Sequence, residues 1–260
     1  MEEKEEAKTR QEKQQIEEEA RAPLEMAAME ELIQNRIAER TALGEKWNVY
    51  VKQLSSGSFA VVGAEKQKAA SLIKLYIMGT VYEQYDNLAA QYGAAELDRL
   101  LTAMITVSDN DAANTLTTYL GGGDSAAGMQ AVNSFCRAHG YDQTHMGRML
   151  LASNENDDNY TSVGDCGHLL QEIYKQDTSG YTHAADMFNL LKAQTRCNKI
   201  PAQLPEGVKT ANKTGELDNV ENDAGIIYDS KNDVVIVFMS QNLSSAGSAQ
   251  NTIATLSRTI

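Results

Sequence analysis

The stretch Ala69-Ala70-Ser71-Leu72-Ile73-Lys74 places a serine and a lysine three residues apart, where the apolar run Leu72–Met78 begins. Positions i and i+3 of a helix lie on one face about one turn apart, so the Lys74 amine can approach the Ser71 hydroxyl. A serine hydroxyl is a weak nucleophile until a neighbouring base accepts its proton. A lysine can be that base if burial and nearby cations lower its pKa. Alone, this spacing is more typical of a helix-start serine near a surface lysine.

Two further short motifs follow in chain order. Ser108-Asp109-Asn110 comes directly after an apolar run that ends at Val107, and Lys213-Thr214-Gly215 follows a segment with strand character. Each motif also has a simpler interpretation. The first contains three residue types that favour helix N-caps, and the second can be an ordinary strand end. All three motifs in this order, each in a suitable local context, are a much stronger signal than any one of them.

Ser-x-x-Lys, Ser-Asp-Asn and Lys-Thr-Gly together are the motif set of class A β-lactamases and penicillin-binding proteins. The flanking sequences at 70–75, 105–114 and 212–217 also resemble this family, and the similarity extends over residues 24–260. The resemblance implies a β-lactamase/transpeptidase-like fold. It also implies a serine hydrolase that forms an acyl-enzyme with β-lactams or D-alanyl peptides.

The resemblance further implies roles for individual residues. Ser71 would be the nucleophile, Lys74 its proton acceptor or the relay to one, and Ser108 the donor to the leaving nitrogen. The backbone N–H groups of Ser71 and Glu216 would stabilise the oxyanion. The implied substrate-binding residues are Asn110, Lys213, Thr214 and Gly215. Asn110 would hold Lys74 and a substrate amide. Lys213 would lower the pKa values of Lys74 and Ser108 and, with Thr214, bind the substrate carboxylate. Gly215 would allow close backbone approach.

Two features depart from the family pattern. Ser71 and Ser108 are separated by 37 positions (108 − 71), fewer than is usual in the lactamases, so we expect a trimmed rim and an altered substrate preference. Leu150 stands where the family's Arg-x-Glu-x-x-x-Asn loop carries the glutamate that activates the deacylating water. Without a placed base, an acyl-enzyme would form but turn over slowly.

The loop that contains Leu150 is also short. Arg148 and Asp158 can still form the ion pair that closes it. Glu155 is the nearest substitute for the deacylation base, although a solvated carboxylate is the simpler interpretation of a glutamate among so many Asn and Asp residues. Acylation is therefore better supported by the sequence than rapid deacylation.

Hydrophobic periodicity predicts an α/β (α+β) fold. An antiparallel sheet from both chain ends is flanked by helices and interrupted by a mostly α-helical insertion. The predicted strands are 47–54, 59–62, 208–214, 224–228 and 233–240. The predicted helices are 29–44, one from about Ser71, 94–107, 111–120, 125–139, 165–174, 183–193 and 247–260. We assign 1–23 to a charged stalk or linker, 24–65 plus 200–260 to a sheet domain, and 66–199 to a helical domain.

Composition limits the partners. The chain has 260 residues, of which 42% are hydrophobic, so it can bury a sizeable core. Its net charge of −13 argues against nucleic acid and against anionic lipid head groups. No apolar run reaches the length of a membrane span, and residues 1–22 show no hydrophobic signal region. Because the resemblance implies work outside the cytoplasmic membrane, we expect any export or anchor segment to be absent from this chain. We also expect a monomer.

Cysteine and histidine spacing gives no sign of a metal site. Cys136, Cys166 and Cys197 allow at most one disulfide, and the sequence leaves open whether Cys166 and Cys197 lie close enough to form it. The four histidines are scattered and no Cys-x-x-Cys pair occurs, so we expect neither a metal nor another cofactor.

Three functional hypotheses remain at this point. The preferred one is the serine hydrolase, with efficient lactamase and carboxypeptidase or penicillin-binding activities both open. The second is a non-hydrolytic penicillin-binding or cell-wall-sensing module of the same fold, presented on the charged N-terminal segment. It is favoured by the missing loop glutamate and disfavoured by the intact motif set. The third is a helical scaffold protein with chance motifs.

Overall fold

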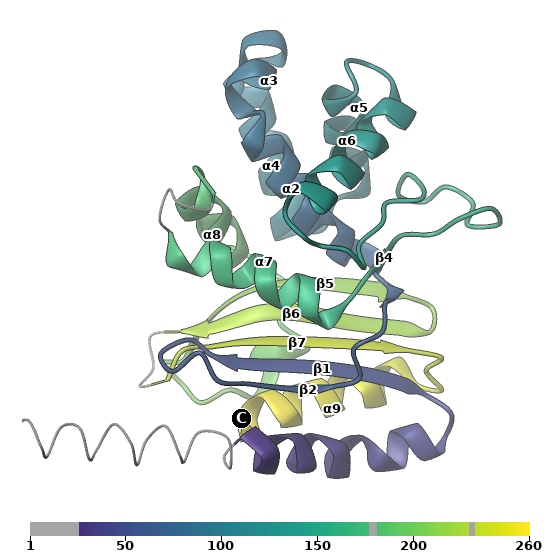
Figure 1. The fold of residues 1–260 in the computed structure, drawn as a ribbon, viewed down its shortest axis with the longest axis vertical. Coiled ribbons are helices and arrows are strands. Elements are labelled where there is room, and N and C mark those ends of the chain that lie inside the picture. Colours follow the sequence, from purple (N-terminus) through teal and green to yellow (C-terminus); the bar gives the residue numbers. More distant parts are fainter. Residues whose placement is uncertain (1–25, 177–180, 229–231) are drawn as a thin grey trace, which may run out of the picture.

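The computed structural model describes residues 26–176, 181–228 and 232–260, so the segment 1–23 lies outside the described residues. The centre is a five-stranded antiparallel sheet with the order β2-β1-β7-β6-β5 (Figure 1). The strands are β1 (Lys46–Gln53), β2 (Phe59–Val62), β5 (Lys209–Leu217), β6 (Val220–Tyr228) and β7 (Val234–Gln241). Pairing of β1 with β7 joins the two chain ends in one sheet. The predicted fold class is therefore confirmed.

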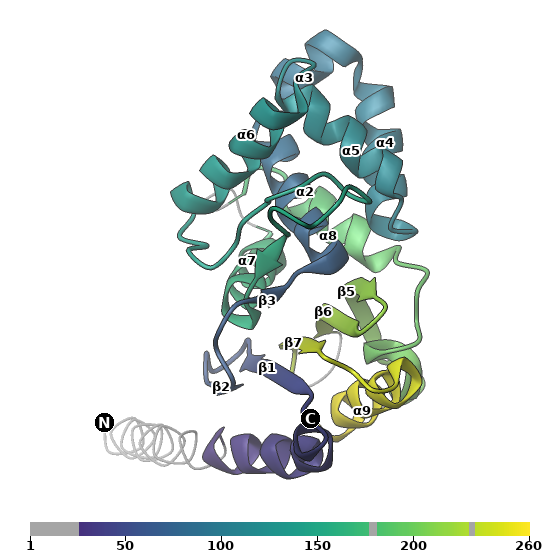
Figure 2. The same ribbon diagram turned by 90° about the vertical axis from the view of Figure 1, so that its right-hand side faces the viewer.

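Helices cover both faces of this sheet. The helices are 26–42, α2 (Ile73–Glu83), α3 (Tyr85–Tyr92), α4 (Ala94–Thr106), α5 (Asn110–Leu120), α6 (Ser125–Ala138), α7 (Val163–Lys175), α8 (Ala184–Lys192) and α9 (Ala246–Thr259). Helix 26–42 and α9 lie on one face, and α7 and α8 lie on the other with the remaining helices beyond them (Figures 1 and 2). None of the helices in the described part of the chain is long and apolar enough to cross a membrane.

The sheet separates two hydrophobic cores, because successive side chains of a strand point to opposite faces. On β7, Val235, Val237 and Met239 belong to the larger core beneath the helical part. Ile236 and Phe238 belong to the smaller core against helix 26–42 and α9. Both faces of this central strand are therefore buried, which explains why its sequence is an uninterrupted apolar run.

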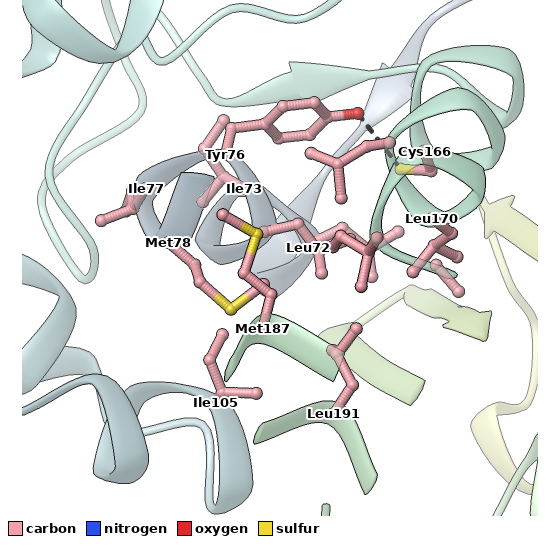
Figure 3. Packing of buried hydrophobic residues seen from close by; sticks show 14 of the residues in the cluster. Leu72, Ile73, Tyr76, Ile77, Met78, Ile105, Cys166, Leu170, Met187 and Leu191 are labelled. Carbon is pink, nitrogen blue, oxygen red and sulfur yellow. Dashed lines mark hydrogen bonds between the residues drawn. The ribbon is translucent and has the colours of Figure 1, made fainter. Parts of the chain in front are cut away.

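Helix α2 forms the centre of the larger core. Every residue from Ile73 to Tyr82 is buried, as expected for a helix that is hydrophobic all round. Figure 3 shows its side chains packed against Ile105 of α4, Leu170 of α7 and Met187 of α8. Contacts on every side fix the position of α2, and with it the Ser71–Lys74 segment at its N-terminal end.

The structure also contains elements that the sequence analysis missed or misplaced. Helix α3 was not predicted as a separate helix, although helical patterns were expected from Ser71 to about Lys192, and the small sheet of β3 (Gln67–Lys68) and β4 (Tyr160–Thr161) was not predicted. Strand β6 begins at Val220, so the predicted start at Ala224 was wrong. The three polar residues between them are buried and paired within the fold, which residue pattern alone does not reveal. The division into the domains 24–65 plus 200–260 and 66–199 stays a prediction.

Close packing of α5 on α6 gives a test of the helical part. A Cβ added to Gly128 of α6 would lie 1.8 Å from the backbone oxygen of Thr117 on α5. Because backbone atoms cannot move aside cheaply, we expect Gly128→Ala to lower the free energy of unfolding by about 1–3 kcal/mol. Urea denaturation measures this change.

Gly247→Ala is the matched control. Gly247 lies in the first turn of α9, and its added Cβ would meet no atom within 4 Å. This variant should be neutral or stabilised by up to about 1 kcal/mol through helix propensity. Equal stability of the two variants would contradict the packing described for α5 and α6.

Candidate active site

Ser71 lies in the 3-10 helix η1 (Ala70–Leu72), immediately before α2. In a 3-10 turn, residues three positions apart are nearly eclipsed, which brings Lys74 beneath Ser71. The Lys74 Nζ lies 3.1 Å from the Ser71 Oγ. Ala70 has the left-handed φ of +48°, an uncommon conformation for a residue with a side chain. Two hydrogen bonds fix the backbone of the preceding Ala69. Its N–H donates to the Asn159 backbone oxygen, and its own oxygen accepts from the Asn222 side-chain amide.

The Lys74 amine is fully buried and surrounded by neutral oxygen atoms. Besides Ser71, it contacts the Ser108 backbone oxygen at 2.7 Å, the Ser108 Oγ at 3.1 Å and the Asn110 Oδ1 at 2.7 Å. Two residues of the Ser-Asp-Asn motif, 34 and 36 positions from Lys74 in sequence, therefore meet at its nitrogen. No carboxylate lies within ion-pair distance of this nitrogen among the residues that the structure describes.

This environment changes the acidity of the amine. The pKa of Lys74 is lowered to about 8, mainly by burial; the negative charge of Asp109 opposes this effect and the positive charge of Arg196 adds to it. A buried ammonium loses hydration that neutral oxygens replace only in part, so the neutral form becomes accessible near physiological pH.

Lys213 approaches Ser108 from the sheet. Its Nζ lies 2.9 Å from the Ser108 Oγ and 2.7 Å from the Thr214 backbone oxygen. Burial holds the pKa of Lys213 well below its usual value, and the nearby charge of Lys74 adds to this effect. The Ser108 hydroxyl thus lies between two buried amines, on a residue with the left-handed φ of +61°.

The Ser-Asp-Asn motif is a helix start as well as part of the site. Asp109 is the N-cap of α5, and its side chain accepts a 2.7 Å hydrogen bond from the Ala112 N–H. The N-cap interpretation is therefore correct for Asp109. It does not compete with the site, because Ser108 and Asn110 face Lys74 on either side of the cap.

Gly215 brings strand β5 against the nucleophile. A Cβ at this position would lie 2.9 Å from the Ala69 oxygen and 3.1 Å from the Ser71 backbone nitrogen. Any side chain would therefore push the strand away from η1. Thr214 is buried next to it, and Glu216 follows at the partly exposed end of the strand.

A charged cluster beside β5 was not found from the sequence. Glu216 binds Arg196 at 2.8 Å and Lys199 at 3.0 Å, and the fully buried Lys199 also binds Glu221 at 2.7 Å. The positive charges of Lys199 and Arg196 keep the pKa of Glu216 below its usual value against the opposing effect of burial. Arg196 lies in a segment without regular structure, so no periodic pattern marks it.

Asp223 is a further buried carboxylate near this cluster. Burial raises its pKa to about 6, although the charge of Lys199 and two hydrogen bonds act in the opposite direction. Those bonds come from the Asn212 amide at 2.9 Å and the Ile200 N–H at 3.0 Å. Asp223 thereby joins the strand that carries Lys213 to the segment that follows Arg196.

The loop around Leu150 is closed as predicted. Arg148 and Asp158 form an ion pair at 2.7 Å. Asn114 of α5 makes two hydrogen bonds with the Leu150 backbone. Its amide NH₂ donates to the Leu150 oxygen at 3.0 Å, and the Leu150 N–H donates to the Asn114 Oδ1 at 2.8 Å. The Leu150 side chain is only 8% exposed and packs in the larger core. Glu155 is exposed, so the structure does not enclose its carboxylate with the Ser71 group.

The structure also bears on the cysteines and on the question of a metal site. Cys136 and Cys166 are buried, Cys197 is exposed, and all three are free thiols. The open question of a Cys166–Cys197 bridge is thus answered for this structure. Within the described ranges, no group of His, Cys, Asp and Glu side chains could hold a metal ion.

The candidate site residues divide into two groups. Ser71, Lys74, Ser108, Asn110 and Lys213 are joined by direct contacts, and Thr214 and Gly215 lie on the strand beside them. The Glu216 carboxylate instead accepts hydrogen bonds from Arg196 and Lys199. Glu155 is exposed and makes no hydrogen bond with the described residues of the Ser71 group. Three segments far apart in sequence therefore converge on one serine–lysine pair.

Comparisons with solved structures match nearly the whole chain. The beta-lactamase from Sphaerobacter thermophilus DSM 20745 has a TM-score of 0.74 at 21% identity, over 87% of this chain and 94% of that one. PBP-A has a TM-score of 0.76 at 22% identity, over 90% and 94%. A leucine-to-glutamate mutant of PBP-A, described as an acyl-enzyme complex with penicillin G, has a TM-score of 0.76 at 21% identity, over 90% and 94%.

Identities this low show the shared fold alone. A search of curated proteins by sequence gives no significant match. A scan against family models, however, matches the model described as the beta-lactamase enzyme family over residues 28–93 and 87–260, which is most of the chain. With the assembled serine–lysine group and the fold, this match shows that the chain belongs to the beta-lactamase enzyme family.

Proposed function

We propose that this chain is a serine acyl-transfer enzyme that is acylated at Ser71 by β-lactams or D-alanyl peptides and releases the acyl group slowly. The observation that carries the proposal is the contact between the Ser71 Oγ and a buried lysine amine with a lowered pKa. Family membership supports the coarser part, a serine β-lactamase or penicillin-binding type of activity. The residue roles below are part of the proposal.

The neighbours of Lys74 dictate where a neutral amine would direct its lone pair. The Asn110 Oδ1 and the Ser108 backbone oxygen can only accept hydrogen bonds, and both lie at 2.7 Å. The two N–H bonds of a neutral amine satisfy them. The lone pair is then left for a hydroxyl. The Ser71 Oγ and the Ser108 Oγ both lie at 3.1 Å, but the Ser108 Oγ has a second amine, that of Lys213, at 2.9 Å. This arrangement suits Lys74 as general base for the attack by Ser71.

Acylation then proceeds in two steps. The Ser71 Oγ forms a bond to the carbonyl carbon while its proton passes to Lys74, and the carbonyl oxygen becomes an oxyanion that the Ser71 and Glu216 N–H groups stabilise. When the carbon–nitrogen bond breaks, the leaving nitrogen takes a proton from Ser108. Contacts of the Ser108 Oγ with both Lys74 and Lys213 support this role, since either amine can resupply the proton.

Substrate binding uses the remaining polar groups. Because the Asn110 Oδ1 is engaged by Lys74, its NH₂ group is the part left to bind a substrate amide oxygen. Lys213 and Thr214 would bind the substrate carboxylate. The Arg196 guanidinium adds positive charge at this end of the site, since it depresses the pKa values of both Lys74 and Lys213.

The deacylation step has no evident general base. The buried, apolar side chain of Leu150 stands where the family pattern has a glutamate, and Glu155 is exposed in the same loop. A water molecule that attacks the ester would have no placed carboxylate to accept its proton. This observation also favours the second candidate, a penicillin-binding or cell-wall-sensing module that is acylated and does not turn over. Sustained hydrolysis of a chromogenic cephalosporin would exclude that candidate.

Location and assembly complete the proposal. We propose that the protein acts outside the cytoplasmic membrane, where peptides that end in D-alanine occur in the cell envelope, and that it acts as a monomer. The net charge of −13 supports a partner other than nucleic acid. No step of the proposed reaction needs a metal or another cofactor.

The first prediction concerns the nucleophile. Ser71→Ala removes the attacking oxygen, so the penicilloyl adduct that intact-protein mass spectrometry detects with benzylpenicillin in the unchanged chain should be absent. Ser134→Ala, at an exposed position of α6, is the control and should be labelled normally. Continued labelling of the Ser71→Ala variant would exclude Ser71 as the nucleophile.

The second prediction concerns deacylation. Leu150→Glu supplies a carboxylate at the clamped position of the loop, so the lifetime of the penicilloyl adduct should fall by about a hundredfold. The decay is followed by mass spectrometry after excess penicillin is removed. Thermal unfolding should be recorded too, because a carboxylate at a buried position costs stability.

Leu151→Glu is the matched control for this change. It adds the same charge one residue later, at a side chain that is 77% exposed, and should leave the lifetime unchanged. Equal lifetimes in the two variants would show that a carboxylate at position 150 cannot act as the base.

The third prediction is the pH dependence of acylation. Below the pKa of Lys74 the amine carries a proton and cannot accept another, so the rate constant should rise with pH and level off above about 8. Asp109→Asn removes the negative charge that raises this pKa but keeps an oxygen to cap α5. Its midpoint should therefore move to lower pH. Stopped-flow acylation measures both profiles, and an unmoved midpoint would argue against Lys74 as the titrating base.

A further inference from the structure

A cavity of about 340 Å³ lies between the end of α2, the start of α3, α4 and α8. Aromatic rings from three of its lining residues lie close together. Tyr82 and Tyr85 are stacked with ring centroids 5.7 Å apart, and the His183 ring lies 5.1 Å from the first and 5.2 Å from the second. The angles between their planes are 16°, 25° and 41°. The three rings thus form one aromatic cluster in which each ring lies against the other two.

Two carboxylates lie in the same cavity. The Asp98 Oδ1 accepts a 2.5 Å hydrogen bond from the Tyr85 hydroxyl, and the Asp186 Oδ2 lies 2.9 Å from the His183 Nδ1. The second oxygen of each carboxylate makes no hydrogen bond within the part of the chain that the structure describes. The tyrosines respond to this charge. The bond to Asp98 raises the pKa of Tyr85 to about 12, with Asp186 adding to the effect.

The described lining contains no lysine or arginine. An anionic ligand would meet two carboxylates here, beside the imidazole of His183 that is paired with one of them. Two carboxylates without further oxygen ligands are also too few for a hard divalent cation, and no metal-binding group is found in the described ranges. Aromatic faces with carboxylates are instead the combination that attracts an organic cation, through the quadrupole of the rings and the charge of the acids.

We propose that this cavity binds a primary alkylammonium ion. The alkyl part would lie on the rings of Tyr82, Tyr85 and His183. The ammonium group would donate hydrogen bonds to the two unengaged carboxylate oxygens of Asp98 and Asp186. The volume is within the range of small-molecule sites. A quaternary ammonium has no N–H to donate to these carboxylate oxygens, so the two acids favour the primary amine.

This site is separate from the proposed catalytic group, although one helix carries both. Ser71 precedes the first turn of α2 and Tyr82 lies in its last turn. Ten residues of helix between them correspond to roughly 15 Å along the axis. Because α2 is buried throughout, a ligand in the cavity does not reach the Ser71 hydroxyl past it.

The test is a titration of the full chain, isotopically labelled, with n-butylammonium chloride in an amine-free phosphate buffer, followed by two-dimensional NMR. We expect saturable shifts of the amides around Asp98 and Asp186. The neutral analogue n-butanol should cause no saturable shift, and tetramethylammonium should bind more weakly. Absence of saturation with n-butylammonium would overturn the proposal. Equal binding of n-butanol or of tetramethylammonium would also overturn it.

Two variants measure separately how much the carboxylate charge and the aromatic rings contribute to binding. Asp98→Asn keeps the shape and removes one charge, and Tyr85→Leu removes one ring face. Each should raise the dissociation constant about threefold to tenfold. Asp111→Asn, an exposed carboxylate in the first turn of α5 outside the cavity, should leave it unchanged. If Asp111→Asn weakens binding as much as Asp98→Asn does, the ion is held by the overall negative charge of the protein and the cavity is not the site.

Discussion

The burial of the Lys74 amine is the constraint on which the site depends. An unpaired charge in a dry interior is costly, and here it is compensated only by neutral oxygens from Ser71, Ser108 and Asn110. These oxygens belong to segments that must stay in fixed positions for the amine to remain satisfied. The fully buried helix α2 supplies one such position, and the capped start of α5 supplies another. The left-handed backbone of Ala70 and Ser108 is a cost that this packing sustains.

Three fully buried lysines show how the same residue type is used in two ways. Lys199 lies between the carboxylates of Glu216 and Glu221, a charge-paired arrangement that suits a structural role. Lys74 and Lys213 contact only hydroxyl, amide and backbone oxygens, and the nearby charge of Lys74 adds to the effect of burial in lowering the pKa of Lys213. The carboxylates of this region lie further away: the charge of Asp109 opposes the lowering of the Lys74 pKa, and that of Asp223 opposes the lowering of the Lys213 pKa.

The centre of the site was predicted from the resemblance of three short motifs to a known family, because helical spacing relates only Ser71 to Lys74, whereas Ser108 lies 34 positions from Lys74. The Ser71–Lys74 pair follows from helical spacing, and the sheet from both chain ends follows from apolar runs. The rest depended on tertiary contacts. Glu221 and Asp223 have the composition of a loop, and only their partners Lys199 and Asn212 explain why they lie in a buried strand. Arg196 lies outside any periodic element, so nothing in its local sequence indicated that it lies beside the site.

The loop around Leu150 has the closing contacts expected from the family pattern but not the acidic side chain expected at position 150. Its closing ion pair, Arg148 to Asp158, is present, and so is the double hydrogen bond from Asn114 to the Leu150 backbone. These contacts hold the loop in place, while the Leu150 side chain is apolar and buried in the core. A leucine there stabilises the loop through packing, whereas a carboxylate would lose hydration. On the proposed mechanism, this side chain favours a stable loop over rapid release of the acyl group.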